Sequence, residues 1–398
     1  FNQFTNLDFG ALRAQIKDYL RVNSDFADFD FEGSNFSTLI DLLAYNTYIT
    51  AYNTNMAVNE CFLDSATLRE NVVSLARNIG YVPRSARSAM ATINFSVDLG
   101  TNDTRIVTLK AGQVALGNQV GGSYIFSIPD DFVATTGDNN VAVFDNLNIY
   151  EGVYLQKSFQ IDYSQPNQRF ILPNANIDTT SIRVTVTSTT SEIYTLYDNI
   201  LRVDAESKLF LIQEIEDEHY EILFGDGILG KKPPSGAIVN VTYIVSNGRA
   251  GNDAKNFSFI GILEDDQSLS VTTGISVLQT KNKASMGDDI EEISSVKYLA
   301  PRIYSSQYRA VTASDYSGII PFVYPNVESV TAYGGEELDP PEFGKVFISI
   351  KPRNGSFLSQ ITKDDISRQL KQYSIAGIKP EIIDLKYLYV EVDTSVYY

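Results

Sequence analysis

The spacing of the apolar residues changes near residue 91, and this change limits the fold more than any other feature of the sequence. Before residue 91, apolar residues recur every three or four positions, as on one face of a helix. After it, Ile93, Phe95, Val97 and Leu99 alternate with polar residues, as in a strand with one buried face. We therefore expect an α+β multidomain fold with an N-terminal helical segment, a β-rich middle domain, a helical joint and a C-terminal α+β sandwich.

Residues 1–90 are expected to form three helices. Ser34 is a candidate N-cap for the second helix, because its hydroxyl can accept a hydrogen bond from the first helical turn. The third helix is expected to begin at Asp64 or Ser65. It is expected to end at Gly80, because glycine takes the left-handed conformation at a helix C-terminus without strain.

The second helix combines a wide apolar stripe with several asparagines, which form helices poorly. Its stability must then come from packing against other helices, either in this chain or in a partner. The apolar residues of the second and third helices are therefore candidate contacts for a partner protein. These residues are Phe36, Leu39, Leu43, Tyr48, Tyr52, Leu68, Val72 and Leu75.

Residues 91–286 are expected to form a β-rich domain. Alternation with a period of two recurs at residues 182–186 and 239–245, and the second segment runs into an Asn247-Gly248 turn. Glycine and asparagine punctuate the sequence between such segments, as in short connected strands. The sequence has no repeat of about 20 to 50 residues, which argues against a solenoid or a propeller.

Residues 287–320 are expected to form a helical joint. Asp288 and Asp289 would lie in the first turn of a helix, where acidic side chains complement the helix dipole. This helix is expected to stop at Pro301, because proline in a helix interior costs about 3 kcal/mol. A second helix is expected to start at a capping box of Thr312 and Asp315. The candidate joint residues are Gly287, Pro301, Arg309, Thr312, Asp315 and Tyr316.

Residues 321–398 are expected to form an α+β domain of two strands, a helix capped near Thr362, and a strand region from residue 382 onward. The sequence stops inside an alternation typical of a strand, and it starts at Phe1 rather than at a methionine. We therefore expect this last domain to be truncated, with sequence missing at both ends.

The excess of acidic residues argues against a nucleic-acid partner. Lys and Arg number 31 against 49 Asp and Glu, which gives a net charge of −18, and no basic cluster interrupts this excess. No stretch approaches the roughly 18 apolar residues of a membrane-spanning helix, so we expect a soluble chain without membrane insertion. Cys61 is the only cysteine and cannot form an internal disulfide, which suits assembly in a reducing cytoplasm.

The sequence offers little for catalysis. His219 is the only histidine, so a metal site would need to be built almost wholly from carboxylates, and a nucleophile would have a single candidate base. Gly225-Asp226-Gly227 lacks the Lys-Ser/Thr of a phosphate loop and is expected to be a turn. The acidic groups at 264–266 and 288–292 lack the ligand spacing of a calcium loop. We therefore expect no enzyme, no cofactor and no metal.

Several motifs, taken in their order, resemble those of a known family. Gly287-Asp288-Asp289, Ala300-Pro301 and the stretch 309–316 resemble the central signature of the baseplate J-like family of contractile phage tails. Phe224-Gly225-Asp226-Gly227 upstream and Gly334-Gly335-Glu336 downstream fit the same family. The helical start, through Gly80-Tyr81-Val82-Pro83, resembles the wedge subunits of T-even-type myoviruses.

The resemblance implies a structural subunit of the baseplate wedge, which holds wedges in the ring and rearranges when the tail contracts. The implied partners are a second copy of the chain, other wedge proteins through the N-terminal helices, and neighbouring wedges in the ring. The implied location is the virion tail baseplate, after assembly in the host cytoplasm. Because the chain stops earlier than the large wedge subunits do, the ring contact near their carboxy terminus is expected to be absent or built differently.

An alternative from another class is a carbohydrate-binding or carbohydrate-active tail component. The chain has 24 tyrosines, and sugars stack on aromatic rings. A hydrolase with paired carboxylates also stays open from the sequence alone. Binding of glycans by residues 91–286 would favour this alternative.

Overall fold

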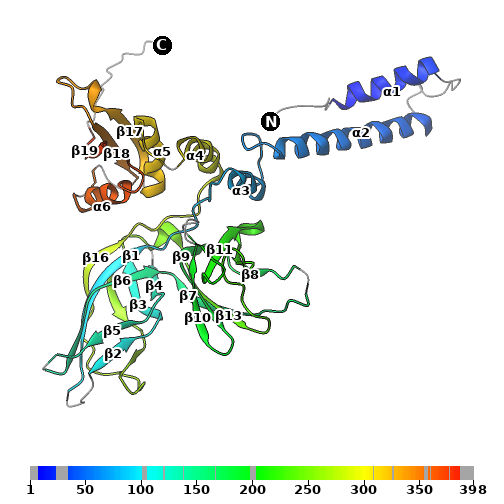
Figure 1. The fold of residues 1–398 in the computed structure, drawn as a ribbon. Coiled ribbons are helices and arrows are strands. Elements are labelled where there is room, and N and C mark those ends of the chain that lie inside the picture. The colour runs from blue at the N-terminus through cyan, green and yellow to red at the C-terminus, as the bar shows by residue number, and fades with distance from the viewer. Residues whose placement is uncertain are drawn as a thin grey trace, which may run out of the picture. The chain divides into compact units, whose positions relative to one another are not determined.

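The computed structural model describes residues 8–23, 35–100, 105–119, 122–137, 139–165, 167–197, 203–307, 309–324, 327–353, 357–358, 360–375 and 377–385. These residues form an N-terminal helical segment and a β-rich body (Figure 1), which confirms the predicted α+β class. They fall into two compact units. One holds Phe1–Val82 with Ile293–Pro301, and the other holds Pro83–Glu292 with Arg302–Tyr398.

Two helices start the chain, α1 (Phe9–Asn23) and α2 (Asn35–Glu60). Asp8 caps α1, because its Oδ1 accepts a hydrogen bond from the Ala11 N–H at 3.1 Å. The predicted N-cap of α2, Ser34, lies outside the described residues. The two helices pack against each other, and Arg13 of α1 forms an ion pair with Asp41 of α2 at 2.5 Å.

Helix α3 (Arg69–Asn78) begins later than predicted, and neither Asp64 nor Ser65 caps it. The N–H groups of Thr67 and Leu68 donate instead to the carboxylate of Glu60, at 2.7 and 3.3 Å. This carboxylate belongs to the last residue of α2, so the cap comes from the preceding helix. The predicted end of the helix is confirmed, because Gly80 has φ +80° directly after the C-cap.

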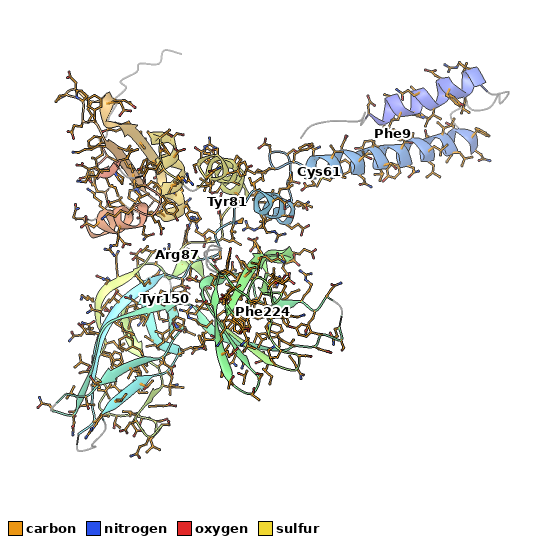
Figure 2. The ribbon with its side chains drawn as sticks, viewed as in Figure 1. Phe9, Cys61, Tyr81, Arg87, Tyr150 and Phe224 are labelled. Atoms are coloured by element: carbon orange, nitrogen blue, oxygen red, sulfur yellow. The ribbon has the colours of Figure 1, made fainter. Side chains whose placement is uncertain are left out.

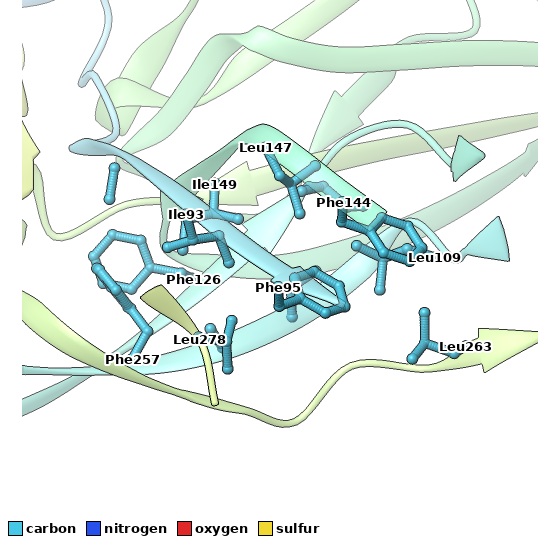
Figure 3. Packing of buried hydrophobic residues seen from close by; sticks show 14 of the residues in the cluster. Ile93, Phe95, Leu109, Phe126, Phe144, Leu147, Ile149, Phe257, Leu263 and Leu278 are labelled. Carbon is cyan, nitrogen blue, oxygen red and sulfur yellow. The ribbon is translucent and has the colours of Figure 1, made fainter. Parts of the chain in front are cut away.

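A six-stranded sheet forms the first part of the β-rich body. Its strands, in spatial order, are β14 (Lys255–Phe259), β3 (Gly112–Gln119), β4 (Gly122–Ile128), β6 (Val141–Glu151), β1 (Met90–Asp98) and β16 (Gln279–Ser285). Strand β1 confirms the alternation from which the strand was predicted. A three-stranded sheet of β15 (Leu263–Glu264), β2 (Ile106–Leu109) and β5 (Phe132–Thr135) closes over the same core. Figure 3 shows this core, in which the rings of Phe95 and Phe144 stack with centroids 4.5 Å apart.

A seven-stranded sheet forms the second part. Its strands, in spatial order, are β7 (Val153–Gln160), β13 (Ile238–Val245), β9 (Ile177–Thr187), β10 (Ser191–Leu196), β11 (Leu209–Glu214), β12 (Tyr220–Phe224) and β8 (Phe170–Leu172). Strands β9 and β13 confirm the two later alternating segments. The sheet has its own core, which includes Tyr194, Phe210 and Tyr243.

The β-rich stretch therefore has two hydrophobic cores, and the second sheet is an insertion in the first. The chain leaves the first sheet after β6, builds the second from residues 153–245, and returns to the first with β14 and β16. Val153 at the start of the insertion pairs directly with Val245 at its end. The entry and exit of the insertion consequently lie side by side.

Helix α4 (Ile293–Ser306) corrects the prediction that a helix stops at Pro301, because the helix continues through this proline. Pro301 is exposed, whereas Val296, Leu299 and Ile303 are buried on both sides of it. Burial of apolar side chains before and after the proline offsets the lost hydrogen bond. Helix α5 (Ala313–Val323) confirms the predicted capping box, in which Thr312 and Asp315 bond each other's backbone N–H.

The C-terminal part has a three-stranded sheet in the order β17 (Val327–Gly334), β18 (Lys345–Pro352) and β19 (Lys379–Ile383). Strand β17 runs antiparallel to β18, whereas β19 runs parallel to it. Helix α5 packs on β17 and helix α6 (Gln360–Leu370) on β19. Helix α6 begins before the predicted cap Thr362, and β19 begins before residue 382; residues 386–398 lie outside the described part.

Candidate functional site

The first candidate site is the exposed side of α2. Six large apolar side chains there are between 37% and 62% exposed, although α1 already covers the side that carries Ile40 and Ala44. We name this surface the α2 ridge. It consists of Leu39, Leu42, Leu43, Tyr45, Ile49 and Tyr52. Contiguous apolar surface of this kind is typical of a helix that packs on another protein.

The predicted contact residues divide between the ridge and the interior. Leu39, Leu43 and Tyr52 belong to the ridge, and Leu68 is also exposed, at the N-terminus of α3. Phe36, Tyr48 and Leu75 are half-buried, and Val72 is fully buried. The wide stripe read from the sequence is therefore shared by an internal face and an exposed face. Contact of these residues with a partner stays a prediction, and Val72 can support it only by holding α3 in place.

The second candidate site is a cluster of buried carboxylates around Asp288. Its Oδ2 accepts a hydrogen bond from Arg84 Nη2 at 3.1 Å, and its Oδ1 accepts one from Arg249 Nε at 2.6 Å. The hydrogen bond with Asp288 raises the pKa of Arg249 above its ordinary value. The backbone of Asp288 bridges that of Arg87, which Figure 2 labels. Glu291 accepts a further bond from the Arg84 N–H at 2.9 Å.

The sequence predicted that Asp288 and Asp289 lie in the first turn of a helix, and this prediction is wrong. Helix α4 starts only at Ile293, with Glu292 as its N-cap. Gly287 is held on both sides by Asn252, whose side chain bonds the glycine N–H and C=O at 2.8 Å each. A Cβ at Gly287 would lie 2.4 Å from the carbonyl oxygen of Gly248, so a side chain cannot fit here without a shift of the backbone.

Glu151 extends the cluster to the entry and exit of the inserted sheet. It follows Tyr150, labelled in Figure 2, and its carboxylate is fully buried. Its Oε2 accepts hydrogen bonds from the Ser246 hydroxyl at 2.8 Å and the Asn247 N–H at 3.1 Å. Its own N–H donates to the carbonyl of Ala89 at 2.8 Å.

Asp178 ties the segment before β1 to the inserted sheet. It lies on β9 and is buried, and its Oδ2 accepts a hydrogen bond from the Ser88 N–H at 2.9 Å. We name the whole cluster the acidic junction. It consists of Glu151, Asp178, Asp288 and Glu291 with Arg84 and Arg249.

The acidic junction is built for holding segments together. Its carboxylates already accept hydrogen bonds from arginines, hydroxyls or backbone N–H groups, which leaves them poorly suited to proton transfer. Within the described ranges, no group of three or more His, Cys, Asp or Glu side chains is arranged to hold a metal. The same ranges contain no helix that is both long and apolar enough to cross a membrane.

The other residues considered for chemistry lie apart from the junction. His219 directly precedes β12. Gly225-Asp226-Gly227 forms the predicted turn, because Asp226 Oδ1 accepts bonds from the N–H groups of Ile228 and Leu229 at 2.8 and 2.9 Å. Cys61 is exposed just after α2.

The candidate joint residues do not form one group in space. Gly287 belongs to the acidic junction, and Pro301 is exposed on α4. Thr312 and Asp315 cap α5, and the hydroxyl of the buried Tyr316 lies 3.2 Å from that of Ser374. Arg309, between the two helices, is also exposed.

The sequence did not reveal Arg84, Glu151, Asp178 or Arg249 as part of a site. Charged residues are usually exposed, and nothing local marks those that are buried. Their partners also lie far along the chain, as Arg84 and Asp288 do. The glycines at 248, 251 and 287 were the available signal, because each leaves room for a neighbouring segment of the junction.

Two models of known families match separate parts of the chain. Residues 8–81, which include α1 to α3, match the helical domain of the family described as baseplate wedge protein gp6-like. Residues 312–383, which include α5 to β19, match C-terminal domain I of the family described as baseplate structural protein gp6.

A relative matches along nearly the whole chain. The chain is 28% identical over 413 residues to the baseplate wedge protein gp6 of Enterobacteria phage T4, a match that includes 99% of this chain and 61% of that protein. The chain thus spans about three fifths of the length of the curated relative.

Two solved structures are similar with TM-scores of 0.35 each. One is from the baseplate of the anti-feeding prophage, with 15% identity over 97% of this chain and 81% of that chain. The other is from the TssK-TssF-TssG baseplate subcomplex of the type VI secretion system, with 8% identity over 87% and 96%. The narrower resemblance to the J-like family stays a prediction. The sequence comparisons agree with the expected baseplate wedge subunit, because this chain is similar over nearly its full length to a baseplate wedge protein.

Proposed function

We propose that this chain is a structural subunit of the wedge of a phage tail baseplate. The observation that carries the proposal is its 28% identity, over 99% of its length, to the baseplate wedge protein gp6 of Enterobacteria phage T4. The two matched family domains lie at opposite ends of the chain and support the same role. The protein then belongs to the virion, at the tail baseplate, after assembly in the host cytoplasm.

The N-terminal helices are the proposed contact with another wedge protein. Helix α1 covers only one side of α2, and the α2 ridge stays exposed on the other. A partner helix that packs on this ridge would bury its leucines and tyrosines. Because the leucines are only 53% to 62% exposed, each would contribute roughly half of the about 1.5 to 3 kcal/mol of full burial. The other proposed partners are a second copy of the chain and neighbouring wedges in the ring. Nucleic acid is not among them.

The function is mechanical, and we infer that the chain is not an enzyme. The acidic junction supports this view, because its buried carboxylates tie the segment before β1, the inserted sheet and the segment before α4 to one another. We propose that residues 1–90, 91–286, 287–320 and 321–398 act as the bundle segment, the β-rich part, the joint and the C-terminal domain. In this view, wedges rearrange on tail contraction by movements between these parts.

The experiment is co-expression of the chain with the other baseplate proteins of its virus, followed by purification of wedge complexes. The double substitution Leu39→Asp with Leu43→Asp should abolish complex formation, because two carboxylates would enter an apolar interface. The control is Ile193→Asp, which changes another exposed apolar residue, on β10 of the inserted sheet. If the double variant gave the same yield of complex as the wild type, the proposed contact would be wrong.

Failure of the contact and failure of the function give different results. If the double variant still enters baseplates, the chain is a baseplate subunit that uses another surface. If the wild-type chain is missing from purified baseplates, the proposed function itself is wrong. Neither the described residues nor the comparisons favour the carbohydrate alternative.

A further inference from the structure

Strand β17 forms one edge of the C-terminal sheet in the part of the chain that the structure describes. It is eight residues long and pairs with β18 on its other side. At its start, the carbonyl of Val327 accepts a hydrogen bond from Arg353 Nε at 3.2 Å, and a bulge separates Val327 from Ser329. The regular edge therefore begins at Ser329. We name residues 329–334 the open edge of β17.

The open edge lacks the devices by which proteins keep sheet edges apart. Such devices are charged residues, prolines, bulges and very short strands. Residues 329–334 are Ser, Val, Thr, Ala, Tyr and Gly, and they include none of the charged residues and no proline. The only bulge in β17 lies before Ser329. An edge of this composition is suited to pairing with another strand.

The other sheet edges among the described residues all have at least one device. Strand β14 has Lys255 and a bulge, and β16 has Lys281 and Lys283. Strand β7 has Lys157, and β19 has Pro380. The remaining edge strands, β8, β15 and β5, have only two to four residues. Strand β17 also has a charge, Glu328, and a bulge at its start, as β14 does. The six residues that follow are nevertheless the longest stretch without such a device among these edges, which makes the open edge the best suited of them to pairing.

The chemistry of the open edge favours a second copy of the same strand. Two copies repel each other through their net charge of −18, so they can approach best where both surfaces are uncharged. An antiparallel pair centred on Thr331 places Ser329 opposite Tyr333, and Glu328 opposite Gly334. A parallel pair in register would instead place Glu328 beside Glu328, and like charges directly opposite destabilise a sheet.

The faces of the sheet also agree with this symmetry. Val330 and Ala332 pair with Ile350 and Ile348 of β18, which are buried, whereas Thr331 is exposed on the opposite face. A two-fold axis through Thr331 and perpendicular to the sheet leaves each side chain on its own face. Both copies then keep their buried residues on the same side of one continuous sheet, and the interface closes on itself.

We propose that β17 pairs antiparallel with β17 of a second copy, with the two Thr331 residues opposite each other. The proposal rests on the second copy of the proposed function, and it names the strand through which the copies meet.

A cysteine at the centre of the pair tests the register. In full-length chain with Cys61→Ser, the substitution Thr331→Cys should give a disulfide-linked dimer on mild oxidation, because directly opposed Cβ atoms lie about 4.5 to 5.5 Å apart. The matched control is Ser329→Cys. Its two copies would be four residues out of register, roughly 13 Å apart, and should stay unlinked. Equal linkage of both variants, or none of Thr331→Cys, would contradict the proposed pairing.

A charge exchange tests the same contact without covalent chemistry. Thr331→Lys and Thr331→Glu should each weaken self-association roughly fivefold at low salt, and an equal mixture should recover it. Sedimentation velocity of the wild-type, single and mixed samples gives the comparison. A wild-type chain that stays monomeric at every concentration overturns the proposal, as does a dimer that both substitutions leave unchanged. The second result retains the second copy but assigns it to another surface.

Discussion

Glu60 connects two helices through one carboxylate. It accepts hydrogen bonds from Thr67, Leu68 and Asn71, all near the start of α3. Desolvation raises the pKa of Glu60, but these bonds outweigh it and lower the pKa to about 2. A lowered pKa means that the charged carboxylate stabilises the folded state. This contribution is complete above the unfolded pKa of about 4.3 and is lost as the pH falls through about 2.

We therefore expect Glu60→Gln to destabilise the α2–α3 region by about 1 kcal/mol at neutral pH, as loss of a helix cap does. The difference from wild type should shrink between about pH 4.3 and pH 2, because the wild-type residue also becomes neutral there. Urea unfolding at several pH values, followed by helical circular dichroism, measures both effects. Glu70→Gln in the first turn of α3 is the control and should change stability by only a few tenths of a kcal/mol. A difference that does not depend on pH would contradict this account.

Asp288 and Asp289 are neighbours with opposite environments. Asp288 is buried between Arg84 and Arg249, whereas the side chain of Asp289 is 57% exposed. Removal of the buried charge leaves Arg84 and Arg249 without their shared carboxylate partner. We therefore expect Asp288→Asn to lower the free energy of unfolding by about 2 to 4 kcal/mol. Asp289→Asn should cost less than about 0.5 kcal/mol. Denaturant unfolding of both variants gives the comparison, and equal costs would show that the junction does not depend on Asp288.

At the scale of elements, α4 is a helix that contains a proline in its interior. Pro301 is exposed, so its replacement removes little packing. We expect Pro301→Ala to stabilise α4 by about 1 to 3 kcal/mol, because alanine restores the missing N–H donor and the helix propensity. The free energy of unfolding from urea titration measures the gain. Pro321→Ala in α5, which is half-buried, serves as the comparison. Destabilisation by Pro301→Ala would mean that the proline shapes the helix.

Elements defined by local pattern were predictable, whereas those defined by distant partners were not. Strand β1 follows from alternation alone, and the capping box of α5 from Thr312 and Asp315. The start of α3 depends on Glu60, a residue of the preceding helix that no pattern within α3 reveals. The continuation of α4 through Pro301 depends on burial that the sequence does not show. Likewise, the α2 ridge is set apart from the rest of the apolar stripe because α1 covers the other side of α2, and the sequence does not show which side that is.

At the scale of the whole molecule, the two sheets of the β-rich body each have an independent core. The buried residues of the first core come only from segments before residue 150 and after residue 253. Those of the second core all come from within 153–245. The sequence predicted one β-rich domain, because alternation gives strands but not which strands share a core. The insertion is recognised only from strand pairs of the first sheet that lie on either side of it in the sequence. One such pair is β1 with β16, which are almost 200 residues apart.

The insertion should therefore be removable. Replacement of residues 153–245 by a short Gly-Ser linker should leave the first sheet folded, because Val153 and Val245 are directly paired and Glu151 still holds Ser246 and Asn247. The excised segment should also fold alone, since its core is complete and its length is within the range of independent domains. Circular dichroism and cooperative urea unfolding of the shortened chain and of the segment test both statements. A shortened chain with Glu151→Ala is the control, and it should be less stable because Ser246 and Asn247 lose their shared acceptor. Loss of cooperative unfolding in the shortened chain would show that the first sheet needs the second, and that the acidic junction joins two interdependent halves.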